Sequence, residues 1–283
     1  MIRREASPRV DETRARPAAL PALLFAALLG AACTFTPTTS LRYDPIVVDT
    51  HAPLDARLAV LPLEDARGEL RYPGYQGRIF MTYIPLLPYV RVAYERLDES
   101  YIRHRQEQGS APDPNDHFPV GMAQEIARDL AQAGLFREVA FVSDPDEARA
   151  YDLRLVGTLR STAFDIYVTS YMLGAPGVLL WILPIPLGKD EATVAIDLEL
   201  RDRADRALWS HSFSEQSSRL FTMYNSAGPS TSREGRIEIK HYGSNGLGID
   251  GDSFWAYHAE ALRGGMGGVK RSLASALPQL RAQ

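Results

Sequence analysis

The chain contains a single cysteine, Cys33, among its 283 residues. No disulfide can therefore form within the chain, and no site that needs two or more cysteine ligands can exist. A chain of this length must instead be held together by a hydrophobic core. Its composition permits one, because 45% of the residues are hydrophobic and 23% are charged, which is typical of a folded globular protein.

The position of Cys33 indicates export and lipid attachment. An uncharged apolar run, residues 20–32, lies directly before it, follows an arginine-containing start and is too short to span a bilayer. The sequence LLGAAC at 28–33 resembles the lipobox of bacterial lipoproteins, with Gly30 where that family prefers a large aliphatic residue. The resemblance implies cleavage of residues 1–32 as a signal peptide and acylation of Cys33 with palmitate-type chains. A plain signal peptide with an incidental cysteine is the alternative.

Thr34 follows the cysteine, where an Asp would signal inner-membrane retention in enteric lipoproteins. The resemblance to that rule implies the outer membrane, with the protein facing the periplasm. Residues 33–56, which are rich in Thr and Pro, are predicted to form a tether.

The charge balance of the mature chain argues against nucleic acid as a partner. Residues 1–32 contain five arginines and three acidic residues, and their removal leaves 26 basic and 32 acidic residues. Sequence-independent binding to the phosphates of nucleic acid needs clustered Lys and Arg residues, which this balance does not supply.

The periodicity of the mature chain predicts two helices and five strands. The first helix starts near Asp116 or His117 with Pro119, buries Val120, Ile126 and Leu130 along one stripe, places Asp129 on the polar face, and ends at Gly134. The second helix starts at Ser253 and ends near Leu277. Short apolar or alternating runs predict strands at 58–63, 135–142, 153–160, 194–201 and 208–221, the last two forming a hairpin.

This order predicts an α+β fold, with a two-layer mixed sheet, two helices on one face and Pro-rich apolar insertions. The domain is expected to be single and to span 57–283, with insertions near 68–116 and 171–188. The segments LAVLPLEDARG, AGLFREVAFV, YDLRLVGTL and EATVAIDLELRD resemble a broad group of envelope lipoproteins. The domain of that group is similar to the N-terminal domain of TolB, to the curli-secretion lipoprotein CsgG and to lipoprotein activators of penicillin-binding proteins.

The most unusual segment is 171–188, which has no charged residue and is interrupted by three prolines. Proline inside a helix costs about 3 kcal/mol, so a membrane-spanning helix is disfavoured. An earlier segment, 79–92, also alternates large aliphatic residues with proline. The two segments either pack on each other as an extension of the core or form an exposed apolar lobe that contacts lipid or a partner. The candidate contact residues are Tyr83, Leu86, Leu87, Tyr89, Leu179, Leu180, Trp181 and Ile182.

No motif for catalysis or cofactor binding is found. The six histidines are scattered, without an HExxH pair, and neither GxSxG nor SxxK occurs. The oxygen-rich residues from Asp113 onward lack the acid and glycine of a calcium loop. The glycines at 264, 265, 267 and 268 do not fit a phosphate loop, and they predict either close backbone packing or a kink in the last helix. We therefore expect no catalytic residue, no metal and no cofactor.

The sequence favours a non-catalytic, membrane-anchored envelope lipoprotein that acts as an accessory, binding or assembly factor. An envelope protein is the expected partner, and a homo-oligomer is compatible with this prediction. One alternative is an oligomeric secretion-channel subunit resembling the curli-secretion lipoprotein. It is disfavoured because 171–188 does not alternate as a membrane hairpin does. The second alternative is an enzyme of unrecognised type.

Overall fold

The computed structural model describes residues 41–47, 53–69, 80–99, 102, 106, 117–222, 230–231, 237–238 and 253–281. Contacts divide the chain into Met1–Phe35 and Thr36–Gln283, and every described residue belongs to the second unit. The predicted signal peptide and Cys33 lie outside the described residues.

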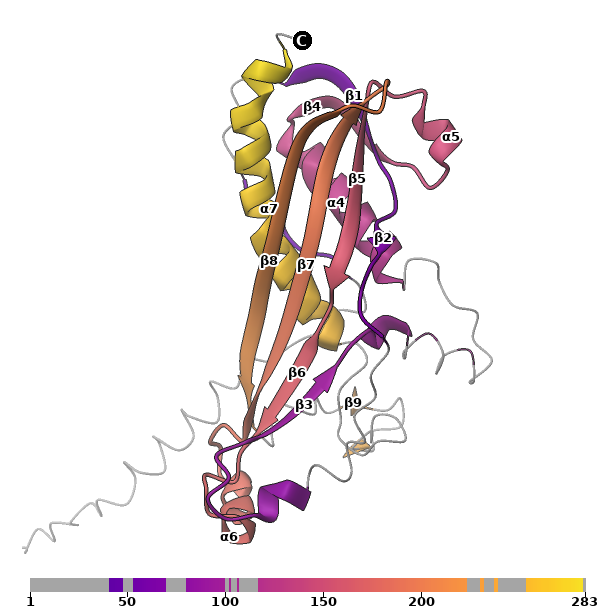
Figure 1. Ribbon diagram of the computed structural model, residues 1–283. Helices are drawn as coiled ribbons and strands as arrows, with labels where there is room; N and C mark the ends of the chain where they lie inside the picture. The colour runs from indigo at the N-terminus through magenta and orange to yellow at the C-terminus, as the bar shows by residue number, and fades with distance from the viewer. Residues whose placement is uncertain are drawn as a thin grey trace, which may run out of the picture. The chain divides into compact units, whose positions relative to one another are not determined.

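The described part of the chain contains the following helices and strands, labelled in Figure 1 where there is room. The strands are β1 (Leu54–Val60), β2 (Glu64–Asp65), β3 (Val90–Tyr94), β4 (Phe136–Phe141), β5 (Leu153–Ser161), β6 (Phe164–Val168), β7 (Gly188–Asp202), β8 (Ala207–Phe221), β9 (Ser230–Thr231) and β10 (Ile237–Glu238). The helices are η1 (Phe80–Tyr83), α4 (Phe118–Ala133), α5 (Pro145–Ala148), α6 (Ala175–Val178), η3 (Leu179–Ile182) and α7 (Ser253–Leu280), of which η1 and η3 are 3-10 helices.

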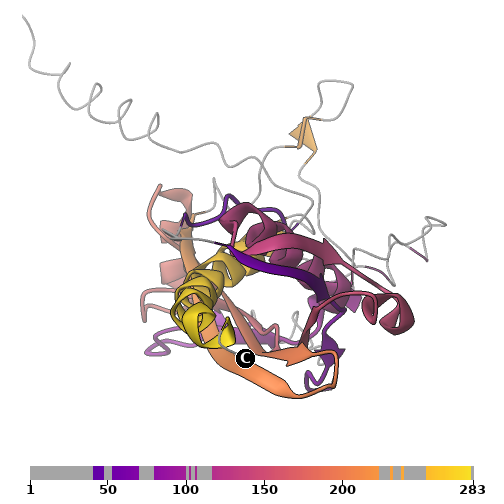
Figure 2. The ribbon, with the colours of Figure 1, turned by 90° about the horizontal axis from the view of Figure 1, so that it is seen from above.

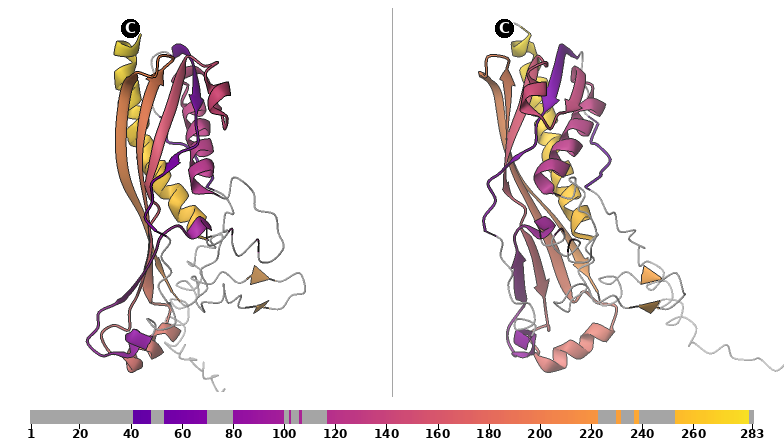
Figure 3. Two further views of the ribbon diagram at one scale, coloured as in Figure 1. Left: turned by 45° about the vertical axis from the view of Figure 1, so that its right-hand side comes forward. Right: turned by 90° about the vertical axis from the view of Figure 1, so that its right-hand side faces the viewer.

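The first eight strands form one open, mixed sheet in the order β3-β6-β7-β5-β1-β4, with β2 beside β5 and β8 beside β7. Strand β1 is parallel to β4 and β5, whereas β7 is antiparallel to β5, β6 and β8. Both long helices cover the same face of this sheet (Figure 3). The predicted α+β, two-layer fold with two helices on one face is confirmed.

Helices α4 and α7 enclose the core together with the sheet, and we call the sheet with these two helices the body. Helix α7 packs on β7 and β8, and α4 packs on β1, β4 and α7; Figure 2 shows α7 nearly end-on beside the orange strands. The core is built from fully buried side chains such as Leu58, Ile126, Leu155, Ile196 and Trp255. Burial of apolar surface of this kind is the main stabilising contribution to a fold.

Helix α4 begins and ends where the sequence predicts. Pro119 occupies its first turn, and Gly134 ends it in the left-handed conformation with φ 63°. The His117 side chain makes no capping hydrogen bond. Instead, the buried Asp98 accepts a hydrogen bond of 3.0 Å from the Phe118 N–H. A carboxylate is favoured at a helix N-terminus, where unpaired N–H groups and the helix dipole are positive.

Helix α7 runs through its four glycines as a single helix, so they mark packing rather than a break between two helices. A Cβ atom on Gly265 would lie 2.2 Å from the Phe213 ring of β8. The absence of a side chain at Gly265 therefore lets α7 approach the sheet closely.

A seven-residue segment before β1 also packs on the body, and we call residues 41–47 the strap. Leu41 and Tyr43 of the strap are buried. The Tyr43 hydroxyl donates to Asp129 Oδ2 of α4 at 3.0 Å, and the Ile46 carbonyl accepts from Nζ of Lys270 in α7. The strap lies within residues 33–56, which the sequence predicts to be a tether.

The strands β5 and β6 follow each other along one side of β7, so that 153–168 and 188–202 form one long hairpin. The connection of this hairpin, 169–187, lies at the end of the sheet where β3 pairs with β6 (Figure 1). Sequence patterns missed β3 and β6 and placed the start of β7 six residues late. The first strand also differs from its prediction, since it begins at Leu54 and ends at Val60.

Candidate functional site

The connection 169–187 and the segment 80–89 meet at one end of the hairpin, and we call these two segments the apolar tip. Neither contains an Asp, Glu, Lys, Arg or His. The Leu86 N–H donates to the Met172 carbonyl at 2.8 Å. At Gly174, which has φ 65°, a Cβ atom would lie only 2.6 Å from the Tyr83 carbonyl oxygen. The two segments are therefore in direct backbone contact.

The structure brings all eight candidate contact residues into the tip or its border, in two classes. The first class is exposed: Leu86 is 77% exposed, Leu179 68% and Ile182 61%, and Tyr83 and Tyr89 are about half exposed. The second class is partly buried: Leu87, Leu180 and Trp181. Leu87 and Trp181 pack against the core cluster. Packing of the two segments on each other and exposure of their apolar side chains thus occur together, although the sequence posed them as alternatives.

Further apolar side chains of the tip are exposed that the sequence analysis did not select. They are Met81, Ile84, Met172, Leu173 and Leu183. All of them lie in 79–90 or 171–188, so the absence of charge across these two stretches was the signal that could have found them. A concentration of exposed apolar residues usually marks a contact surface.

Several polar atoms of the tip are paired within the tip and its border, whereas the buried Ser170 Oγ has no hydrogen-bond partner. Trp181 Nε1 donates to the Thr169 carbonyl at 2.8 Å, and the Tyr171 hydroxyl donates to the Pro186 carbonyl at 2.6 Å. The Thr169 hydroxyl donates to the Pro88 carbonyl at 2.7 Å. Burial raises the pKa of the Tyr171 hydroxyl. These rings therefore turn their polar atoms toward the tip backbone.

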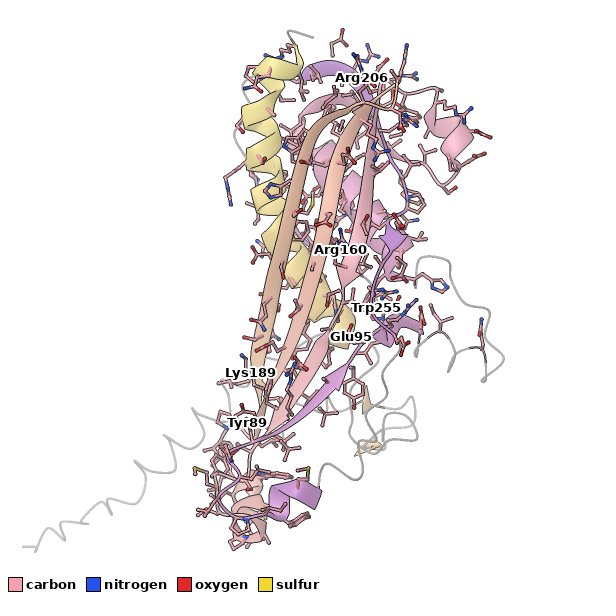
Figure 4. All side chains as sticks on the ribbon, viewed as in Figure 1. Tyr89, Glu95, Arg160, Lys189, Arg206 and Trp255 are labelled. Atoms are coloured by element: carbon pink, nitrogen blue, oxygen red, sulfur yellow. The ribbon has the colours of Figure 1, made fainter. Side chains whose placement is uncertain are left out.

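Three residues of neighbouring strands form a row across the sheet directly beside the tip. We call Arg91, Tyr167 and Lys189 the cationic row. Arg91 is in register with Tyr167, which is in register with Lys189. The Arg91 guanidinium carbon and Lys189 Nζ each lie 5.9 Å from the centroid of the Tyr167 ring. Arg91 is paired with Asp165 and Lys189 with Glu191, and the hydrogen bond to Asp165 raises the pKa of Arg91. Figure 4 shows Lys189 and Tyr89 near the tip and Arg206 at the opposite end of the hairpin.

A second polar arrangement lies inside the body, where α4, α7 and the strap meet. Lys270 and Asp129 are fully buried, and Lys270 Nζ lies 2.6 Å from Asp129 Oδ1. The Arg128 guanidinium donates to the Tyr43 carbonyl at 2.6 Å. Burial, followed by the neighbouring Asp129 carboxylate, raises the pKa of the Tyr43 hydroxyl. The sequence placed Asp129 on the polar face of α4, and this was wrong because Lys270 and Tyr43 compensate its charge in the core.

Two depressions on the surface of the body are lined by other residues. The larger one, about 610 Å³, lies against β5, β7 and β8 and contains the ion pairs Arg160–Asp197 and Arg201–Glu199. The smaller one, about 450 Å³, lies near Leu54 and Leu280. Neither of these two depressions involves a residue of the tip.

Two of the described histidines, His211 and His258, contact other residues of the fold. His258 is buried with its Nε2 atom 3.2 Å from the Thr162 carbonyl, and the His211 ring stacks on Trp209. Among the residues that the structure describes, His, Cys, Asp and Glu nowhere gather in a group of three or more that could hold a metal ion. Within the same residues, no helix combines the length and the apolarity needed to cross a membrane.

Comparisons with known proteins find no matching family model and no match among the curated proteins. Among solved structures, the chain is similar to a neuraminyllactose-binding hemagglutinin homolog from Helicobacter pylori, with 9% identity, a TM-score of 0.31, and coverage of 82% of this chain and 92% of that chain. It is also similar to lipoprotein GNA1162 from Neisseria meningitidis, with 15% identity, a TM-score of 0.21, and coverage of 58% and 83%. These low scores do not establish a shared fold. Neither name is that of TolB, the curli-secretion lipoprotein or a penicillin-binding-protein activator, so that resemblance stays a prediction.

Proposed function

We propose that the chain is a lipid-anchored envelope lipoprotein of the outer membrane that faces the periplasm and acts as a non-catalytic binding or assembly factor. Its contact surface is the apolar tip. The observation that carries this proposal is the uncharged, exposed apolar surface of the tip. The resemblance of residues 28–33 to a lipobox supports the anchor at Cys33.

The fixed geometry of the tip supports a contact role. Leu86, Tyr171 and Met172 have positive φ angles of 69°, 56° and 65°. Such angles are unfavourable for residues with a side chain and persist only where the surrounding structure enforces them. The tip is thus held in one arrangement at a conformational cost, although its exposed apolar side chains contribute little burial to the fold.

The strap supports a location close to the bilayer. Because residues 41–47 pack on the body, the acylated Cys33 is at most eight positions along the chain from a residue in contact with the body. An extended segment of this length spans at most about 28 Å. The body would therefore stay within about this distance of the membrane that holds the anchor.

Site-specific photo-crosslinking in living cells tests this proposal. A photo-reactive residue at Leu179 of the full chain is expected to form adducts in the envelope, with lipid or with one defined envelope protein. The same residue at Val47, which is 90% exposed and lies outside the tip, serves as the matched control. Mass spectrometry of the mature chain is expected to find fatty acids on Cys33, and Cys33→Ser is expected to lack them.

Three results contradict the proposal. Adducts of equal yield at Leu179 and Val47 exclude the tip as the contact surface. Adducts at Leu179 that contain only this chain indicate a homo-oligomer rather than an accessory factor. A mature chain that carries no fatty acid on Cys33 excludes the lipid anchor.

A further inference from the structure

We propose that the ligand of the apolar tip is a phospholipid surface, into which the tip inserts down to the level of the cationic row. This inference rests on the proposed function and specifies the partner of the same site. It commits to lipid rather than to a protein groove, and a protein partner is an outcome of the test below.

The order of polarity along the hairpin matches the order of layers in a lipid surface. The tip has no charge, the cationic row follows, and the carboxylates of Asp165 and Glu191 lie one step farther from the tip on the same face of the sheet. A bilayer has the same sequence of hydrocarbon, phosphate headgroups and water. Aromatic and basic residues are favoured at the headgroup level, where Lys and Arg extend their charges toward water and phosphate.

The backbone of the tip suits an environment that lacks water. Polar groups in lipid must find partners within the protein. Five prolines, at 85, 88, 176, 184 and 186, carry no N–H group that would need one. Other N–H groups are paired locally, including those of Leu86, Leu173 and Leu187, whose acceptors are the carbonyls of Met172, Ser170 and Phe221. The prolines thus disfavour a spanning helix but favour a shallow insertion.

The exposed side chains fit a fluid surface better than a shaped one. They come from both segments of the tip, with Met81 and Leu86 in one and Met172, Leu179 and Leu183 in the other. A lipid surface accepts exposed apolar side chains without a matching pocket.

Trp181 provides a direct readout of insertion. It is the tryptophan of the tip, whereas Trp209 and Trp255 are buried in the body. The lipidated full chain is reconstituted into vesicles of phosphatidylethanolamine and phosphatidylglycerol, with and without chains brominated near their middle. Bromine quenches tryptophan fluorescence on contact. We expect quenching in the brominated vesicles, and we expect Trp181→Phe to remove it.

A double charge substitution tests the role of the tip while the anchor stays intact. Leu86→Asp/Leu179→Asp is expected to lose the quenching, because a carboxylate is strongly disfavoured in hydrocarbon. The positive φ at position 86 is adopted more readily by Asp than by Leu, so this variant should fold, and circular dichroism checks that it does. Val47→Asp adds a charge at an exposed site outside the tip and is expected to leave the quenching unchanged.

The outcomes separate this inference from the proposed function. If quenching is absent and a photo-reactive residue at Leu179 captures one defined envelope protein in cells, lipid insertion is wrong. The proposed function as a binding factor is then still supported. Absence of both signals overturns both proposals. Quenching that persists in the folded double variant, or that persists in Trp181→Phe, excludes insertion of the tip.

Discussion

The body and the apolar tip contain similar large aliphatic and aromatic residues but use them in opposite ways. In the body, Leu155, Ile196 and Trp255 are at most 2% exposed, and charged residues surround the core. In the tip, Leu86, Leu179 and Ile182 are mostly exposed, and no charged residue occurs. The comparison shows that composition alone does not separate a residue that stabilises the fold from one that is available for contact. The two kinds of residue are separated by their position relative to the two helices.

The two regions also differ in how they treat polar groups. The body buries whole ion pairs, such as Lys270–Asp129, whose Nζ and Oδ1 atoms lie 2.6 Å apart with both side chains inaccessible. The tip contains only neutral groups, and the polar ring atoms of Tyr171 and Trp181 bond to nearby carbonyls. Charged residues are thus kept in the body, where they are paired. They are absent from the tip, where contact with lipid is proposed.

The largest expected difference between the two regions is in the free energy of unfolding when a leucine is truncated to alanine in each. Leu155→Ala should lower the free energy of unfolding by about 4 kcal/mol, because it leaves a cavity beside the central strands. Leu179→Ala should lower it by less than about 0.5 kcal/mol, because its side chain is 68% exposed. Urea unfolding followed by circular dichroism measures both values. Equal effects would mean that the tip is part of the core.

A smaller effect is expected from the buried ion pair. Asp129→Ala removes the carboxylate that compensates Lys270 and should lower the free energy of unfolding by about 3 kcal/mol. The matched variant Asp129→Leu/Lys270→Met replaces the pair with apolar residues and should recover most of the loss. If the double variant is as unstable as Asp129→Ala, the pair is not compensated in the way described.

A third effect concerns pH and lies at the border of the two regions. Burial raises the pKa of Asp190 in β7 to about 7, while the Tyr257 hydroxyl, 3.5 Å from its Oδ2, lowers it to a lesser extent. The folded chain therefore binds this proton more tightly than the unfolded chain does. The stabilisation is fully present below about pH 4 and is lost as the pH rises through about 7.

We expect the free energy of unfolding to fall by about 3 kcal/mol on this account between those two pH values. Asp190→Asn should remove that part of the pH dependence, which unfolding curves at a series of pH values would measure. The tip has no acid, base or histidine that titrates in this range. A pH profile unchanged by Asp190→Asn would mean that the carboxyl is not perturbed.

The helices and the layer arrangement could be predicted from the sequence because their signals are local. Pro119, Gly134 and the apolar stripe between them fix α4, and the second helix was found from its periodicity and a serine at its start. Strand β6 was missed because it continues β5 after a short break at Thr162 and Ala163 and then runs into the uncharged connection. Its boundary is set by pairing with β3 and β7 rather than by its own pattern.

The candidate site could be predicted in part. The absence of charge marked the residues of the tip, and the structure adds the backbone contact between its two segments. The surroundings of Asp129 could not be predicted, since Tyr43 is 86 residues and Lys270 is 141 residues away along the chain. A charged residue on the polar face of a predicted helix gives no local sign that a distant cation will bury it.

The strap also determines where mechanical load enters the molecule. A pull on an acylated Cys33 would pass through residues 34–40 and reach the body at Leu41 and Tyr43, before it reaches β1. The hydrogen bonds of Tyr43 and Ile46 to Asp129 and Lys270 would then carry the tension into α4 and α7 together. With the proposed anchor on Cys33, drag from the membrane would thereby be shared between α4 and α7.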